Sequence, residues 1–137
     1  MRTAAAPRWH TVFRLWLILF GVVCIGIGLA HLLFGPATII GGGPVSATVD
    51  SELRFYAVLF MGFGAAFIWA ARDIAQRGGV VNALGVLFLL GGLARFLAWW
   101  QSGPPHWFFI AMIAVEIVIP AVNWLAVTRI RSDRVEV

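Results

Sequence analysis

Two ionisable residues stand inside apolar stretches of this sequence, where charged side chains are rare. Glu116 lies near the middle of one apolar stretch, four residues before Pro120, and Arg95 lies in the stretch that precedes it. An ionisable group in the hydrocarbon core of a membrane costs roughly 2.5 to 3.5 kcal/mol on insertion scales, so such groups usually face protein or water and mark a site. Arg95 and Glu116 are therefore the first candidates for chemistry.

The positions of Arg95 and Glu116 suit an ion pair. Arg95 precedes Trp100 by about 7 to 8 Å of helix, and Glu116 follows Trp107 by about 13 to 14 Å. Side chains lean toward the N-terminus of their helix, so on antiparallel helices these two point toward each other. Pro120 lacks the backbone donor that would bond the carbonyl of residue 116. The pair either fixes helix register or forms part of a binding site.

Three further polar residues complete the predicted ligand-binding set. They are His31, Glu52 and Arg54, each near the end of an apolar stretch. Arg54 is predicted to reach toward lipid headgroups or to pair with Glu52. A histidine near a helix end is more often a satisfied polar group than a ligand, and we interpret His31 in that way first.

Catalytic and metal-binding motifs are missing from the sequence. It contains no H-E-x-x-H, no G-x-S-x-G and a single cysteine, so the usual hydrolase, zinc and disulfide patterns are excluded. A metal site would need His31, His106 and an acid at positions 50 or 52 to converge from three segments. We predict no catalytic residue, no cofactor and no metal.

The composition is that of a membrane protein. Of the 137 residues, 61% are hydrophobic and only 12% are charged, which is far from the usage of soluble globular chains. The net charge of +4 comes from arginines in short segments beside the apolar stretches. That distribution suits anionic lipid headgroups, whereas nucleic acid would need a continuous basic face. The lipid bilayer is therefore the expected partner, and nucleic acid is not.

Four apolar stretches must position these residues. They cover residues 13–34, 53–71, 80–100 and 107–127, and each is long enough to cross a core of about 30 Å. The sequence predicts an all-α, four-helix transmembrane bundle that forms a single domain over residues 1–137. The first stretch exceeds the roughly 7 to 15 apolar residues of a signal peptide and has no clear A-x-A site, which favours a retained helix over a cleaved one.

The arginines predict the orientation. They precede the first stretch, separate the second from the third and follow the fourth, while residues 35–51 and 101–106 contain none. By the positive-inside rule both termini are cytoplasmic and the other two loops face outward, in a bacterial cytoplasmic membrane. The arginines used are Arg2, Arg8, Arg14, Arg72, Arg77, Arg129, Arg131 and Arg134.

Local signals predict boundaries and layout. Ser51 is predicted to cap the second helix, and the prolines at 104 and 105 to precede the fourth. Glycines spaced along the first three stretches predict close helix packing. The segment at residues 28–33 also parallels that at 92–97, which supports two helical hairpins related by an axis along the membrane normal.

The sequence resembles a family of small bacterial four-helix membrane proteins known as a domain of unknown function. The resemblance rests on Ser51-Glu52-Leu53-Arg54 with Gly62 and Gly64, on Gly91-Gly92-Leu93-Ala94-Arg95, and on Glu116 with Pro120. It covers most of the chain. It implies that Glu52, Arg54, Arg95 and Glu116 act as a set, and it names no substrate.

Three functions remain open. Small size and the missing catalytic motifs favour an accessory or assembly subunit, either a homo-oligomer or part of a larger membrane complex. The alternative is a protein that binds or transports a lipid or small amphiphile in an outer-half polar cavity, with Arg95 contacting an anionic head and Glu116 gating by protonation. An enzyme that uses Glu116 and His31 as acid and base on a membrane-embedded substrate is the third.

Overall fold

The computed structural model describes residues 7–135, and it is all helical apart from the connections. Four helices follow one another: α1 (Arg8–Phe34), α2 (Ala47–Ala70), α3 (Ile74–Ser102) and α4 (Trp107–Val135), with a short 3₁₀ helix η1 (Gly35–Thr38) after α1. Each of the four is long and apolar enough to cross a membrane. The predicted all-α fold with four membrane-spanning helices is confirmed. Arg2, used above for orientation, lies outside the described residues, as does the side chain of Arg134.

Two of the helices, α2 and α3, begin where short polar side chains cap them. Ser46 accepts a hydrogen bond from the backbone N–H of Val49, and α2 therefore begins at Ala47. The prediction that Ser51 caps this helix is wrong, because Ser46 provides the cap more than one turn earlier. Asp73 in the same way caps α3 by accepting from the N–H of Gln76. The connection between α2 and α3 thus shortens to residues 71–73.

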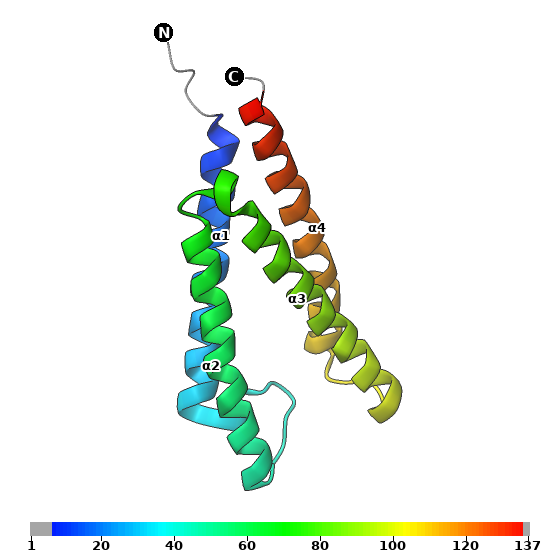
Figure 1. Ribbon diagram of the computed structural model, residues 1–137. Coiled ribbons are helices and arrows are strands. Elements are labelled where there is room, and N and C mark those ends of the chain that lie inside the picture. The colour runs from blue at the N-terminus through cyan, green and yellow to red at the C-terminus, as the bar shows by residue number, and fades with distance from the viewer. Residues whose placement is uncertain (1–6, 136–137) are drawn as a thin grey trace.

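The four helices form two hairpins. Within the first, a Cβ built on Gly21 would lie 2.5 Å from the carbonyl oxygen of Gly64, so only glycine permits this approach of α1 to α2. Within the second, a Cβ on Gly92 would lie 2.9 Å from Cβ of Glu116, which brings α3 close to α4. Figure 1 shows the α1–α2 hairpin beside the α3–α4 hairpin.

The two hairpins pack together mainly at one end of the molecule. We call the end that holds the start of α1 and the finish of α4 the terminal end, and the opposite end the far end. The terminal end contains the shared core, in which Phe20 contacts Phe67 and Phe88 with ring centroids 5.1 and 5.3 Å apart. Trp16 of α1 also donates to Oδ1 of the buried Asn123 of α4, at 3.1 Å.

Toward the far end the hairpins diverge (Figure 1). Large side chains there are exposed, including Tyr56 on α2 and Phe96 on α3. The long α1–α2 loop connects the two hairpins at this end. A Cβ on Gly41 of the loop would lie 2.8 Å from Cβ of His106 in the α3–α4 connection. The molecule is thus closed by a core at the terminal end and bridged by a loop at the far end.

Candidate functional site

Arg95 and Glu116 meet across the α3–α4 interface. Nε of Arg95 donates to Oε1 of Glu116 at 2.8 Å. Both helices belong to one hairpin and run in opposite directions, so their side chains lean toward each other, as the sequence analysis expected. The missing side chain of Gly92 gives the carboxylate its space.

Glu116 is buried and only partly satisfied. The residue is 5% exposed, and its Oε2 has no hydrogen-bond partner among the described residues. Burying a carboxylate oxygen without a hydrogen-bond partner costs free energy, so such an oxygen is expected to bind water, an ion or a ligand. Pro120 lies one turn further along α4 and cannot donate to the Glu116 carbonyl. Oε2 of Glu116 is therefore an acceptor without a partner among the described residues, and the Glu116 carbonyl receives no hydrogen bond from residue 120.

Arg95 is held at one nitrogen and open at the others. Its side chain is 42% exposed, and only Nε has a hydrogen-bond partner in the described part of the chain. The guanidinium carbon also lies 5.3 Å from the ring centre of Phe109, a cation–π contact within α3–α4. The two terminal nitrogens, which are the ones that bind carboxylate or phosphate in pairs, remain available.

Arg95 lies on the line of α3 residues that meets the first hairpin. Val81 and Phe88 lie fourteen and seven residues before it, and residues seven apart share a helix face with a drift of roughly 20°. Val81 is fully buried in the shared core, and Phe88 contacts Phe20 and Phe63 of the first hairpin. Arg95 continues this line into the region where the hairpins diverge.

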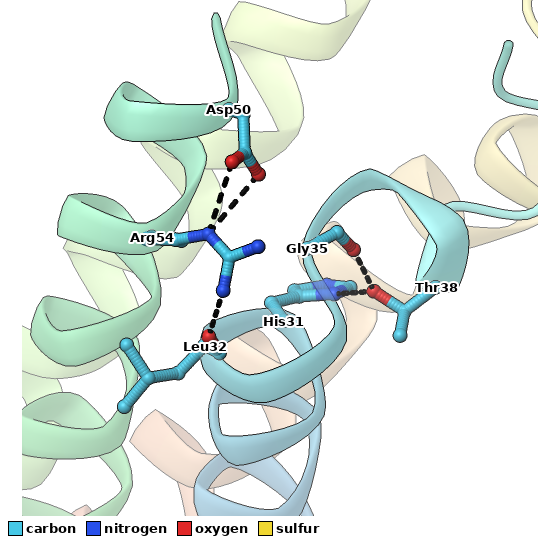
Figure 2. A network of polar contacts seen from close by, with 6 residues as sticks. All are labelled: His31, Leu32, Gly35, Thr38, Asp50 and Arg54. Carbon is cyan, nitrogen blue, oxygen red and sulfur yellow. Dashed lines mark hydrogen bonds and ion pairs between the residues drawn. The ribbon is translucent and has the colours of Figure 1, made fainter. Parts of the chain in front are cut away.

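A second polar cluster lies at the far end of the first hairpin (Figure 2). Arg54 of α2 donates through Nε to both carboxylate oxygens of Asp50, at 3.1 Å each, and through Nη1 to the carbonyl of Leu32. A cation at the last carbonyls of α1 satisfies the end of that helix and complements its dipole. The cluster therefore ties the start of α2 to the end of α1.

Glu52 does not take part in this cluster. Glu52 is the predicted partner of Arg54, but in the structure Asp50 is bonded to Arg54. Residues four apart on a helix face each other, whereas residues two apart do not. Glu52 is exposed. The suggested Arg54–Glu52 pair is corrected to Arg54–Asp50.

His31 is engaged within its own hairpin. Its Nδ1 hydrogen-bonds with the hydroxyl of Thr38, which in turn donates to the carbonyl of Gly35 (Figure 2). Gly35 has φ +57°, and a Cβ there would lie 2.6 Å from Asp50, so glycine is required at this turn. His31 thus stabilises the turn that ends α1.

The predicted ligand-binding residues are therefore divided between two places. Arg95 and Glu116 form one site on the second hairpin, His31 and Arg54 belong to the cluster on the first, and Glu52 lies on the surface beside it. In the described residues no three of His, Cys, Asp or Glu lie close enough together to hold a metal ion.

Among the described residues, two of the hollows are lined by neither Arg95 nor Glu116. The first, of about 520 Å³, lies under the α1–α2 loop against Asp50 and Arg54. The second, of about 500 Å³, lies between α3 and α4 and is lined by small and apolar side chains with Asn82 at its wall. The loop therefore covers Arg54 rather than Arg95.

Sequence reasoning missed two parts of this arrangement. Phe109, whose ring faces the Arg95 guanidinium, carries no signal that separates it from the other aromatics of α4. Asn123, which joins the hairpins through Trp16, could have been identified from the sequence, since a polar amide in an apolar stretch needs a partner.

The chain matches a known protein family. The sequence model of the family described as Domain of unknown function (DUF4345) covers residues 12–127. No curated protein and no solved structure matches the chain significantly.

Proposed function

This chain belongs to the DUF4345 family, and we propose that it is a small membrane protein that binds the anionic head of an amphiphile at Arg95. The proposal is supported by a guanidinium within a long apolar helix, whose two terminal nitrogens have no hydrogen-bond partner among the described residues and whose side chain is 42% exposed. In hydrocarbon such a group needs a polar partner. An amphiphile supplies an anion at that depth together with an apolar chain.

The direction of Arg95 argues against simple contact with the headgroup layer. A lone arginine in a membrane usually extends its flexible chain to the nearest interface. Arg95 lies on a helix whose N-terminus is at the terminal end, so its side chain leans away from the far end, and Nε is tied to Glu116. The anion must therefore come to the arginine. Arg54, on a helix of opposite direction, leans toward the far end and already bonds to Asp50 and to the carbonyl of Leu32.

The chemistry of the head follows from the donors. Arginine binds phosphate or carboxylate through two parallel N–H groups, and the terminal nitrogens of Arg95 offer that arrangement. Phe96, the next residue on α3, is an exposed apolar side chain. Its surface suits an acyl chain. Phospholipids and fatty acids share the required chemistry.

An assembly subunit is the second candidate function. The same open guanidinium would then meet a carboxylate on a helix of another subunit, either a second copy or a larger complex. Interhelical polar contacts of this kind stabilise association in membranes by about 0.6 to 2 kcal/mol each. The experiment below separates the two candidates.

The test is native mass spectrometry of the protein from phosphatidylcholine nanodiscs, with phosphatidylglycerol or palmitate added in separate arms. Arg95→Gln removes the open donors, and Arg129→Gln removes an equal charge from the exposed part of α4 at the terminal end. We expect an adduct with wild type and Arg129→Gln that Arg95→Gln loses, and the arm in which it appears identifies phosphate or carboxylate. Equal adducts in all three proteins would refute the proposal. A protein partner lost only in Arg95→Gln would favour the assembly role.

A further inference from the structure

Arg95 and Glu116 form a site with one positive and one negative charge. The contact uses Nε of Arg95 and Oε1 of Glu116, which leaves the other carboxylate oxygen, Oε2, buried without a partner among the described residues. Glu116 is 5% exposed, so water screens its charge poorly. The negative charge of Glu116 must therefore be balanced by groups of the protein.

An anion on the terminal nitrogens of Arg95 upsets that balance. Two anions would then share one guanidinium in a region of low dielectric, and an uncompensated charge there is strongly unfavourable. Two carboxylates that share a site respond by keeping one proton between them. No second cation contacts Glu116 in the part of the chain that the structure describes.

We propose that binding of an anionic head at Arg95 is coupled to the uptake of one proton by Glu116. The proton comes from water and bonds to Oε2, the oxygen that has no partner, while Oε1 continues to accept from Nε of Arg95. One negative charge enters with the ligand and one is neutralised on the protein, so the net charge of the site is unchanged. The inference rests on the proposed function, because it requires the anion to bind.

Most of the other titratable groups near the far end already have partners. On α1, His31 lies on the face that carries Phe20 and bonds with Thr38. On α2, Arg54 and Asp50 bond to each other, and Glu52 is exposed. His106, before α4, accepts from the N–H of Phe108. His31 is the competitor for the proton, and the experiment includes it.

The experiment is isothermal titration calorimetry of short-chain phosphatidylglycerol into the protein in phosphatidylcholine nanodiscs. The phosphodiester stays ionised over the pH range used, so it contributes no proton. At each pH, two buffers with different enthalpies of protonation report the number of protons taken up. We expect uptake that approaches one proton per ligand for wild type, and an affinity that falls by up to about tenfold per pH unit as pH rises.

Variants locate the proton. Glu116→Gln keeps an oxygen acceptor for Nε and should bind the ligand with no proton uptake and no pH dependence, while His31→Gln should behave as wild type. Should Glu116→Gln fail to fold, infrared difference spectra of wild type should still show a carboxylic acid band on ligand addition. Binding without proton uptake overturns the coupling and leaves the proposed function standing. Uptake lost in His31→Gln also overturns it, and no binding by wild type overturns the proposed function itself.

Discussion

Arg95 is bound to Glu116 through one nitrogen and presents the other two to the surroundings. Both residues could be identified from the sequence because each is a charge in an apolar stretch. Their meeting was also predictable, since consecutive antiparallel helices bring residues at similar depth together. The partner of Arg54 could not be predicted from the sequence. It depends on where α2 begins, and the helix that starts after Ser46 places Asp50, not Glu52, one turn from Arg54.

The first prediction concerns the coupling between Arg95 and Glu116. Each single glutamine variant should lower the free energy of unfolding by about 1 to 3 kcal/mol, less than the loss for a fully buried pair because Arg95 is half exposed. The double variant should lose less than the sum of the two. Reversible unfolding in mixed micelles measures all four proteins. Additive losses would show that the two side chains do not interact in the membrane.

The second prediction concerns Asp50. Asp50→Asn removes the negative charge of the ion pair that holds Arg54 against the end of α1. The free energy of unfolding should fall by about 0.3 to 1 kcal/mol, since both side chains are about a third exposed. Glu52→Gln is the matched control, because it removes an equal charge two residues away and contacts nothing in the cluster. A larger effect from Glu52→Gln, in the same unfolding assay, would contradict the geometry of Figure 2.

At the scale of helices, apolar stretches predict the existence of each element well, because hydrocarbon requires about 20 apolar residues in a row. They predict the ends less well. Helices continue past the apolar stretch wherever a cap and a few polar helix formers allow, as they do from Asp73 into α3. The glycine positions indicated close packing in the sequence, but only the structure shows which glycines meet a neighbour.

The third prediction separates glycines in contact from glycines that face open space. On α2, a Cβ at Gly64 would lie 2.5 Å from the backbone oxygen of Gly21, while a Cβ at Gly62 would meet nothing within 4 Å. Gly64→Ala should therefore push α1 from α2 and destabilise the first hairpin by about 1 to 3 kcal/mol. Gly62→Ala should be neutral or stabilising by up to about 1 kcal/mol. Equal effects in thermal unfolding would contradict this helix interface.

At the scale of the whole molecule, two hairpins share a core at the terminal end and separate toward the far end (Figure 1). The sequence predicted four helices in two hairpins, but not this divergence, because nothing in the apolar pattern distinguishes side chains that meet another helix from those that meet lipid. Orientation by the positive-inside rule stays a prediction. Arg95 lies in the diverging region with its side chain 42% exposed.

The fourth prediction tests the contact that joins the hairpins. Trp16→Phe removes the hydrogen bond to Oδ1 of Asn123. Because Nδ2 of Asn123 already lacks a partner in the described chain, the substitution leaves the whole buried amide without a hydrogen bond. The cost should be about 1 to 3 kcal/mol of unfolding free energy. Trp124→Phe, at a 57% exposed position, provides the control and should change little. Similar losses in both would mean that Asn123 does not hold the hairpins together.

The central claim is contact between the Arg95 guanidinium and an anionic head, and solid-state NMR can measure it directly. Protein with ¹⁵N-labelled arginine is reconstituted in phosphatidylcholine with added phosphatidylglycerol, and dipolar coupling between the ligand phosphorus and guanidinium nitrogens is recorded, with Arg95→Lys to assign the signal. The account predicts a coupling that places phosphorus about 4 Å from a terminal nitrogen of Arg95, as in a paired arginine–phosphate contact, and that disappears in Arg95→Lys. A spectrum that is unchanged by the substitution would contradict the account.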